Sequence, residues 1–150
     1  MADATISVED RHEIYDTLAR YVWSMDTDDI EAVVATFTPD GVVKDVTGKR
    51  WDAAAVEVRG FASHFFARPN RRSGQHHVQH LFVEPAEGGG YCVTSYWVSL
   101  QWDTEGDRKF IRAMGSYVDT CVKVDGEWRI KEKLIDPWNS ASAPMVGHRL

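Results

Sequence analysis

The sequence has few cysteines and no long apolar run, and each lack removes a class of protein. Its only two cysteines, Cys92 and Cys121, form no CxxC pair, which is typical of buried free thiols rather than a disulfide framework. No window approaches the ~18 consecutive apolar residues of a membrane helix. The first ten residues, MADATISVED, lack the apolar stretch of a secretory signal. We therefore expect a cytoplasmic protein with no membrane partner.

Positive charge is also scarce. The chain has 17 Lys and Arg against 23 Asp and Glu, a net charge of −6, and its basic residues are scattered, so the basic patch of a nucleic-acid binder is missing. By contrast, 43% of the residues are hydrophobic and 11% are aromatic. A length of 150 residues suits a single domain, residues 1–150, and no repeat or low-complexity tract divides it. The expected partner is a small hydrophobic molecule.

The first half of the chain has the periodicity of helices. Ser7 and Asp10 form a capping box ahead of an apolar stripe with helical spacing, which predicts a helix over residues 8–25. A short helix over 30–37 should end before a turn formed by the letters PDG. The segment VEVRGFASHFFAR, residues 56–68, predicts a third helix.

The second half has strand signals. Alternating and β-branched segments separated by glycine-rich turns predict four long strands, over 75–86, 90–103, 108–123 and 127–136, and two short strands over 41–46 and 49–51. Asp125-Gly126 favours a type I′ hairpin because both residues tolerate positive φ. Helices followed by an antiparallel meander predict an α+β fold, in which a curved sheet wraps around helices and leaves a cone-shaped pocket.

Three segments carry a resemblance to a known family: IYDTLARYVWSMDTDDIEAVVATFTPDGVV, HHVQHLFVE and GSYVDTCVKVDGEWRIKEKLI. With the order of elements, they resemble the SnoaL-like branch of the nuclear transport factor 2-like superfamily over residues 8–136, which leaves 137–150 as a C-terminal tail. Within that branch the chain is similar to the group of scytalone dehydratase, bile-acid 7α-dehydratase and hexachlorocyclohexane dehydrochlorinase. The resemblance implies an α+β barrel shaped like a cone, a lyase without a cofactor, and a homo-oligomer, with a trimer favoured over a dimer.

The resemblance also implies the site residues. The dehydratase group pairs an Asp just after the first helix with a His early in the first long strand, and these positions are Asp26 and His76. Bile-acid dehydratase adds a Tyr five residues before that Asp, which matches Tyr21. In physical terms, a carboxylate that holds one imidazole nitrogen makes a general base at neutral pH, and a phenol can protonate a departing oxygen. This combination predicts an elimination.

Each of these residues has an alternative role. Asp26 can instead cap the second helix, and Tyr21 lies on an apolar stripe of the kind that is usually core. On a regular strand His76 and His80 share one face and His77 takes the other, so His80 is a candidate substrate contact. His77 replaces His76 as the base if a β-bulge shifts the parity. A metal is the remaining alternative, but an H-x-x-x-H pair converges on one metal on a helix rather than on a strand, so none is expected.

We expect large side chains to line the pocket. The substrate-binding candidates besides His80 are Trp51, Phe65, Tyr96, Met114 and Arg112. For the apolar candidates the alternative is the core or an oligomer interface, and for Arg112 it is an outward-facing strand position. The loop PNRRSG at 69–74 and the tail are candidates to cover the opening.

Two classes of function remain. The first is a cofactor-free lyase, with a ketosteroid-isomerase-like isomerase or an aldol cyclase as alternatives that use the same base. The second is a non-catalytic domain that binds a ligand or supports an oligomer, as in the β subunits of ring-hydroxylating dioxygenases. The two classes differ in whether His76 and Asp26 meet beside a cavity.

Overall fold

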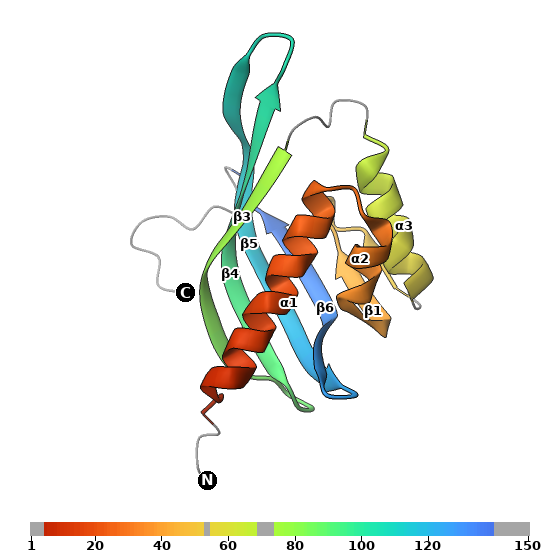
Figure 1. The fold of residues 1–150 in the computed structure, drawn as a ribbon, viewed down its shortest axis with the longest axis vertical. Helices are drawn as coiled ribbons and strands as arrows, with labels where there is room; N and C mark the ends of the chain where they lie inside the picture. The colour runs from red at the N-terminus through yellow and green to blue at the C-terminus, as the bar shows by residue number, and fades with distance from the viewer. Residues whose placement is uncertain (1–4, 53–54, 69–73, 140–150) are drawn as a thin grey trace.

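The computed structural model describes residues 5–52, 55–68 and 74–139. Its elements are α1 (Val8–Asp26), α2 (Ile30–Ala35), β1 (Phe37–Lys44), β2 (Arg50–Trp51), α3 (Ala55–Phe66), β3 (Gly74–Pro85), β4 (Tyr91–Asp103), β5 (Arg108–Val124) and β6 (Glu127–Pro137). The strands form one curved sheet in the order β2-β1-β6-β5-β4-β3, and the helices cover one of its faces (Figure 1). The expected α+β class is confirmed, although the sheet is open, with β2 and β3 as its edges.

Helix α1 begins where the capping box predicts. The Ser7 side chain accepts a hydrogen bond from the Asp10 backbone N–H at 2.9 Å and its hydroxyl donates to the Asp10 carboxylate at 2.8 Å. The apolar stripe of α1, which includes Ile14, Leu18 and Met25, is buried against the sheet. None of the helices in the described ranges is long and apolar enough to cross a membrane.

The segment after α2 differs from the prediction. Helix α2 ends at Ala35, and the PDG letters lie inside β1, where the pairing with β6 shifts between Phe37 and Val42. Strand β1 runs parallel to β6, so the sheet is mixed rather than a purely antiparallel meander. The Ile130 backbone N–H donates to the carbonyl of Thr36 at 2.9 Å. Because this hydrogen bond starts the pairing with β6 directly after α2, the chain continues as strand β1 and not as a further turn of α2.

The antiparallel part of the sheet follows the predicted strands. Strands β3 to β6 each begin and end within one residue of the predicted ranges. Asp125 and Gly126 have φ values of 51° and 84°, as the type I′ turn between β5 and β6 requires. We call the face of this sheet that the helices cover the inner face and the opposite one the outer face. Val93 and Trp97 of β4 lie buried on the inner face, whereas Tyr96 is exposed on the outer face.

The β-bulges in β3 and β5 change which face a side chain takes. In β3 the pairing with β4 shifts between Gln79 and Phe82, and His80 has a φ of 60°. In β5, Ala113 lies opposite Ser99 and Ile111 opposite Leu100, which leaves Arg112 without a partner in the ladder. Such bulges re-aim side chains next to functional sites. The hairpin of β4 and β5 from Ser99 to Arg112, which we call the arm, extends beyond the helices (Figure 1).

Candidate active site

Asp26 and His76 form a hydrogen-bonded pair although they lie 50 residues apart. The Asp26 Oδ1 and His76 Nδ1 atoms are 2.6 Å apart, and the His76 backbone N–H donates to Asp26 Oδ2 at 2.9 Å. An ionised carboxylate only accepts hydrogen bonds, so Nδ1 is the protonated ring nitrogen, and in a neutral imidazole the free lone pair is then on Nε2. The side chains are 16% and 14% exposed, which leaves the pair partly open to solvent.

The position of Asp26 follows from where α1 ends. Asp26 is the last residue of α1, and the end of this helix lies beside the start of β3 (Figure 1). Asp29 caps α2 instead, because its side chain accepts a hydrogen bond from the Ala32 backbone N–H at 3.0 Å. The capping alternative for Asp26 is therefore wrong, and its carboxylate is available to His76.

A small recess lies beside this pair. Its lining residues are Asp26, Phe65, Gly74, His76, Ser99, Leu100, Gln101 and Arg112. The recess itself has a volume of about 10 Å³, roughly the space for one water. It adjoins a groove of about 680 Å³ along the arm, which shares Gly74, Leu100 and Gln101 with it and is also lined by Trp102 and Phe110. The arm groove by itself has the size of a small-molecule site.

Two of the predicted substrate-binding residues lie at the recess. Phe65 places its ring 5.8 Å from the His76 imidazole, and Arg112 lies at the bulge of β5. Trp51 lies elsewhere: its indole N–H donates to Asp45 at 2.8 Å and its ring packs against Phe61 of α3. Trp51 therefore supports the packing of α3 and does not line the recess.

The other three candidates lie on the outer face, which corrects the prediction. Parity assigned His80 to the side of His76, but the bulge at His80 turns its exposed side chain outward, where its ring lies 5.9 Å from that of Tyr96. Tyr96 and Met114 are likewise exposed on the outer face because β4 and β5 alternate regularly there. His77 is exposed too, so His76 is the histidine that meets Asp26. Among the described residues no cluster of His, Cys, Asp and Glu is arranged to hold a metal.

Tyr21 lies deeper than predicted. It is buried among aromatic rings, 5.9 Å from Phe37 and 6.5 Å from Tyr117 between centroids, and it does not line the recess. Burial, followed by the charges of Tyr117, Asp119 and Asp26, raises its pKa well above the ordinary value. Its phenol therefore stays protonated at neutral pH.

Two further residues of the recess, Ser99 and Gln101, lie in a segment with a recognisable pattern. Ser99 and Gln101 line the recess without having been predicted. Both belong to the segment SYWVSLQWD, in which Ser95, Trp97, Ser99 and Gln101 recur with a period of two. Polar residues on the side of a strand that also carries a buried tryptophan are the pattern of a site on a core-facing surface.

A second acid–base pair lies below the site and was not predicted. Lys133 Nζ is 2.8 and 3.0 Å from the two carboxylate oxygens of Asp119, and both side chains are almost completely buried. The same ammonium lies 3.8 Å from the ring centre of Tyr117 and 4.4 Å from that of Tyr21. Burial raises the pKa of Asp119, while the charge of Lys133 opposes that rise. This pair is sealed from solvent.

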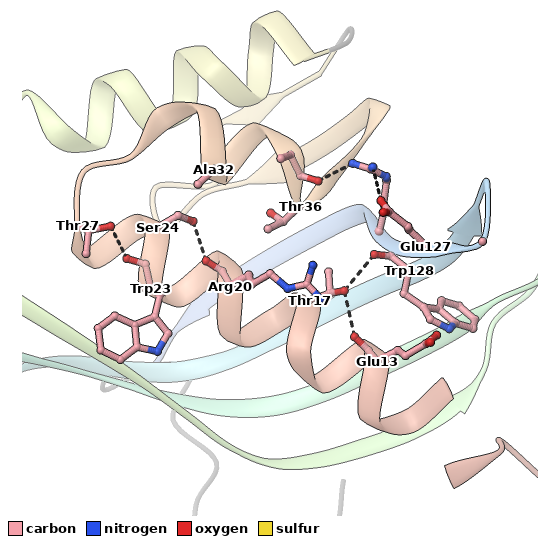
Figure 2. A pocket seen from close by; sticks show the side chains of 13 residues that line it. Glu13, Thr17, Arg20, Trp23, Ser24, Thr27, Ala32, Thr36, Glu127 and Trp128 are labelled. Carbon is pink, nitrogen blue, oxygen red and sulfur yellow. Dashed lines mark hydrogen bonds and ion pairs between the residues drawn. The ribbon is translucent and has the colours of Figure 1, made fainter. Parts of the chain in front are cut away.

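A separate groove of about 460 Å³ lies between α1, α2 and the β5–β6 hairpin (Figure 2). None of the residues of the Asp26–His76 pair lines it. Its hydroxyl groups already donate to backbone carbonyls: Thr17 to Trp128, Ser24 to Tyr21 and Thr36 to Val33. The groove is lined by charged side chains, Glu13, Arg20, Glu127 and Arg129, but by no histidine.

Comparison with known families gives one match that spans most of the chain. The family of SnoaL-like domains matches residues 7–133. No curated protein matches the sequence.

Solved structures share the fold. A protein of unknown function with a cystatin-like fold from Nostoc punctiforme has a TM-score of 0.76, with 20% identity over 90% of this chain and 96% of that chain. A protein of unknown function from Mycobacterium tuberculosis has a TM-score of 0.77, with 26% identity over 92% and 82% of the two chains. A candidate scytalone dehydratase from Novosphingobium aromaticivorans has a TM-score of 0.73, with 19% identity over 95% and 97%.

Proposed function

Because the chain belongs to the family of SnoaL-like domains, which includes polyketide cyclases and dehydratase-like enzymes, we propose that it is a cofactor-independent lyase. The reaction is a dehydratase-like elimination on a small, hydrophobic, cyclic molecule. One observation carries the proposal: the hydrogen bond between Asp26 and His76 beside a recess that solvent can reach. A carboxylate that orients an imidazole is the arrangement of a general base.

The elimination assigns a role to each group. His76 Nε2 removes a proton from a carbon next to a carbonyl, and the electrons of that C–H bond form a carbon–carbon double bond as the bond to a hydroxyl group breaks. Asp26 keeps the ring nitrogen Nδ1 protonated and stabilises the imidazolium that forms. The hydroxyl leaves as water after it takes a proton from a donor in the site. The imidazolium finally returns its proton to that donor.

Tyr21 is the donor that we propose for the departing oxygen. Its phenol keeps its proton because burial raises its pKa. The charge of Asp26 also contributes to this rise, after burial and the charges of Tyr117 and Asp119. Phe65 beside the recess and Phe110 in the arm groove supply apolar surface for the ring of the substrate.

A turnover assay with model substrates tests the proposal. Cyclic β-hydroxy ketones are incubated with the wild-type protein and the chelator EDTA, and the conjugated enone that loss of water creates is followed by its absorbance. We expect turnover by the wild-type protein and its loss in His76→Ala. His77→Ala is the matched control, because His77 is the exposed neighbour on the same strand and should be dispensable.

The outcomes separate the function classes. A His76-dependent shift of a double bond without loss of water would favour the isomerase, and His76-dependent carbon–carbon bond formation would favour the cyclase. Binding without turnover of any compound would favour the non-catalytic domain. Turnover that is equal in His76→Ala and the wild-type protein would contradict the general base itself.

We also propose that the chain forms a homo-oligomer, with a trimer favoured over a dimer, through its outer face. Phe82, Tyr96, Trp102, Ile111 and Met114 are all between 39% and 62% exposed there, and large apolar side chains exposed on one face are typical of a protein–protein interface. Sedimentation of the wild-type protein and of Phe82→Ser/Ile111→Ser tests this. We expect dissociation of the variant, and a monomeric wild-type protein would contradict the proposal.

A further inference from the structure

We propose that the substrate carries a carboxylate and that Arg112 binds it at the edge of the recess. This inference rests on the proposed lyase function, because it concerns the same recess. The substrate would then be a cyclic carboxylic acid rather than an uncharged cyclic molecule.

The bulge in β5 places Arg112 at the recess. On a regular strand Arg112 would share the outer face with Met114, two residues further on. The ladder instead skips it, with Ala113 opposite Ser99 and Ile111 opposite Leu100. The side chain therefore joins Asp26 and His76 in the lining of the recess. A bulge that re-aims one side chain toward acid–base groups is a feature with a functional consequence.

The positive charge of Arg112 is not compensated within the described residues, whereas the other cations of the arm are. Arg108 lies 3.9 Å from Asp103, and Lys109 lies 2.8 Å from Asp107. The Arg112 side chain is exposed to solvent and forms no ion pair or side-chain hydrogen bond with any residue of the ranges that the structure describes. A guanidinium that lines a recess without an acidic partner is ready to bind one from a ligand.

Asp26 is not the acidic partner of Arg112, although both residues line the recess. Its two oxygens accept hydrogen bonds from the ring and the backbone of His76, and no Asp26 oxygen lies within ion-pair distance of Arg112. A guanidinium binds a carboxylate through two parallel hydrogen bonds, which fix orientation as well as position. A ring acid held by Arg112 would therefore present one of its other carbons to His76 Nε2, with its ring near Phe65.

A binding experiment with two matched probes tests the inference. 2-Naphthoate and 2-naphthamide have nearly the same shape, but only the acid is charged at neutral pH. By titration calorimetry we expect the wild-type protein to bind 2-naphthoate about tenfold more tightly or better, since a charged bidentate pair contributes at least that much. Arg112→Gln should remove the preference, and Arg112→Lys should retain part of it.

Control variants make the outcome specific. Arg108→Gln changes an arginine of the same strand that already has an acidic partner, and it should keep the wild-type preference. A preference that survives Arg112→Gln, an equal loss of affinity for both probes in that variant, or no binding of 2-naphthoate to the wild-type protein would each overturn the inference.

The two proposals fail separately. The preference for the acid is a binding property and should persist in His76→Ala, which lacks the general base. Turnover of neutral hydroxy ketones together with equal binding of both naphthalenes would keep the lyase and reject the carboxylate. An Arg112-dependent preference without any turnover would keep the carboxylate site and reject the lyase.

Discussion

Two aspartates, Asp26 at the end of α1 and Asp119 on β5, each pair with a basic side chain of the sheet, and the two pairs differ in access to solvent. Asp26 and His76 lie beside the recess, and their side chains are 16% and 14% exposed, respectively. Asp119 and Lys133 lie below the aromatic rings of Tyr21 and Tyr117 and are 0% and 1% exposed. Both pairs have short contacts, 2.6 and 2.8 Å. Of the two pairs, only the first is open to solvent.

This difference shows that acid–base residue types do not identify a site by themselves. A buried ion pair loses the hydration of both charges, and it is stable only while both partners are present. A partly exposed His–Asp pair loses less hydration and can change its protonation state during a reaction. We therefore expect substitutions in the first pair to change activity and substitutions in the second to change stability.

The largest expected effect is on the rate. Asp26→Asn keeps the size of the side chain but removes its charge, so the imidazolium that forms at His76 is no longer stabilised. We expect turnover of a β-hydroxy ketone to fall by about 10²–10⁴-fold, with little change in thermal stability. A rate within about threefold of the wild-type value would show that the pair is not the base.

The second effect is on stability. Lys133→Met leaves the buried carboxylate of Asp119 without a partner, which should destabilise the fold by about 3–5 kcal/mol in urea unfolding. The double variant Lys133→Met/Asp119→Leu removes both charges and should recover most of that loss. If the single variant were as stable as the wild-type protein, the sealed pair would not hold the core together.

Tyr21 lies between the two pairs, and its substitution tests which of them it serves. Tyr21→Phe keeps the ring that packs against Phe37 and Tyr117 but removes the proton donor. We expect a loss of about 100-fold in kcat for substrates with a hydroxyl leaving group, and a much smaller loss for substrates whose leaving group needs no proton, such as halide. Equal losses for both would assign Tyr21 to packing alone.

The smallest expected effect is on the pH dependence of stability, and it involves the ion pair of Asp10 and Lys123 at the surface. Hydrogen bonds from Lys123, Ser7 and Trp128 lower the pKa of Asp10 from 3.8 to about 2. A lowered pKa in the folded state adds stability above pH 3.8 that is lost as the pH falls toward 2. Asp10→Asn should therefore be less stable than the wild-type protein at neutral pH, and the urea midpoints of the two should converge as the pH approaches 2. Parallel midpoints across this range would contradict the prediction.

Much of the fold could be read from the sequence because its signals are local. The capping box at Ser7, the helical stripe of α1 and the Asp125-Gly126 turn each depend on neighbouring residues, and each lies where it was predicted. The Asp26–His76 pair came from a family pattern rather than from local spacing, and the structure brings the two side chains together.

The sequence by itself therefore determined helix α1, the long strands and the turn between β5 and β6, whereas the pair Asp26 and His76 was identified from the family pattern. Only the tertiary structure decided the faces of His80 and Arg112, the burial of Lys133 with Asp119, and the parallel pairing of β1 with β6. The physical reason is that side-chain periodicity is set within one strand, whereas a bulge and an ion pair depend on the neighbouring strand. A single extra residue in one ladder turned His80 away from the site, and another brought Arg112 to it.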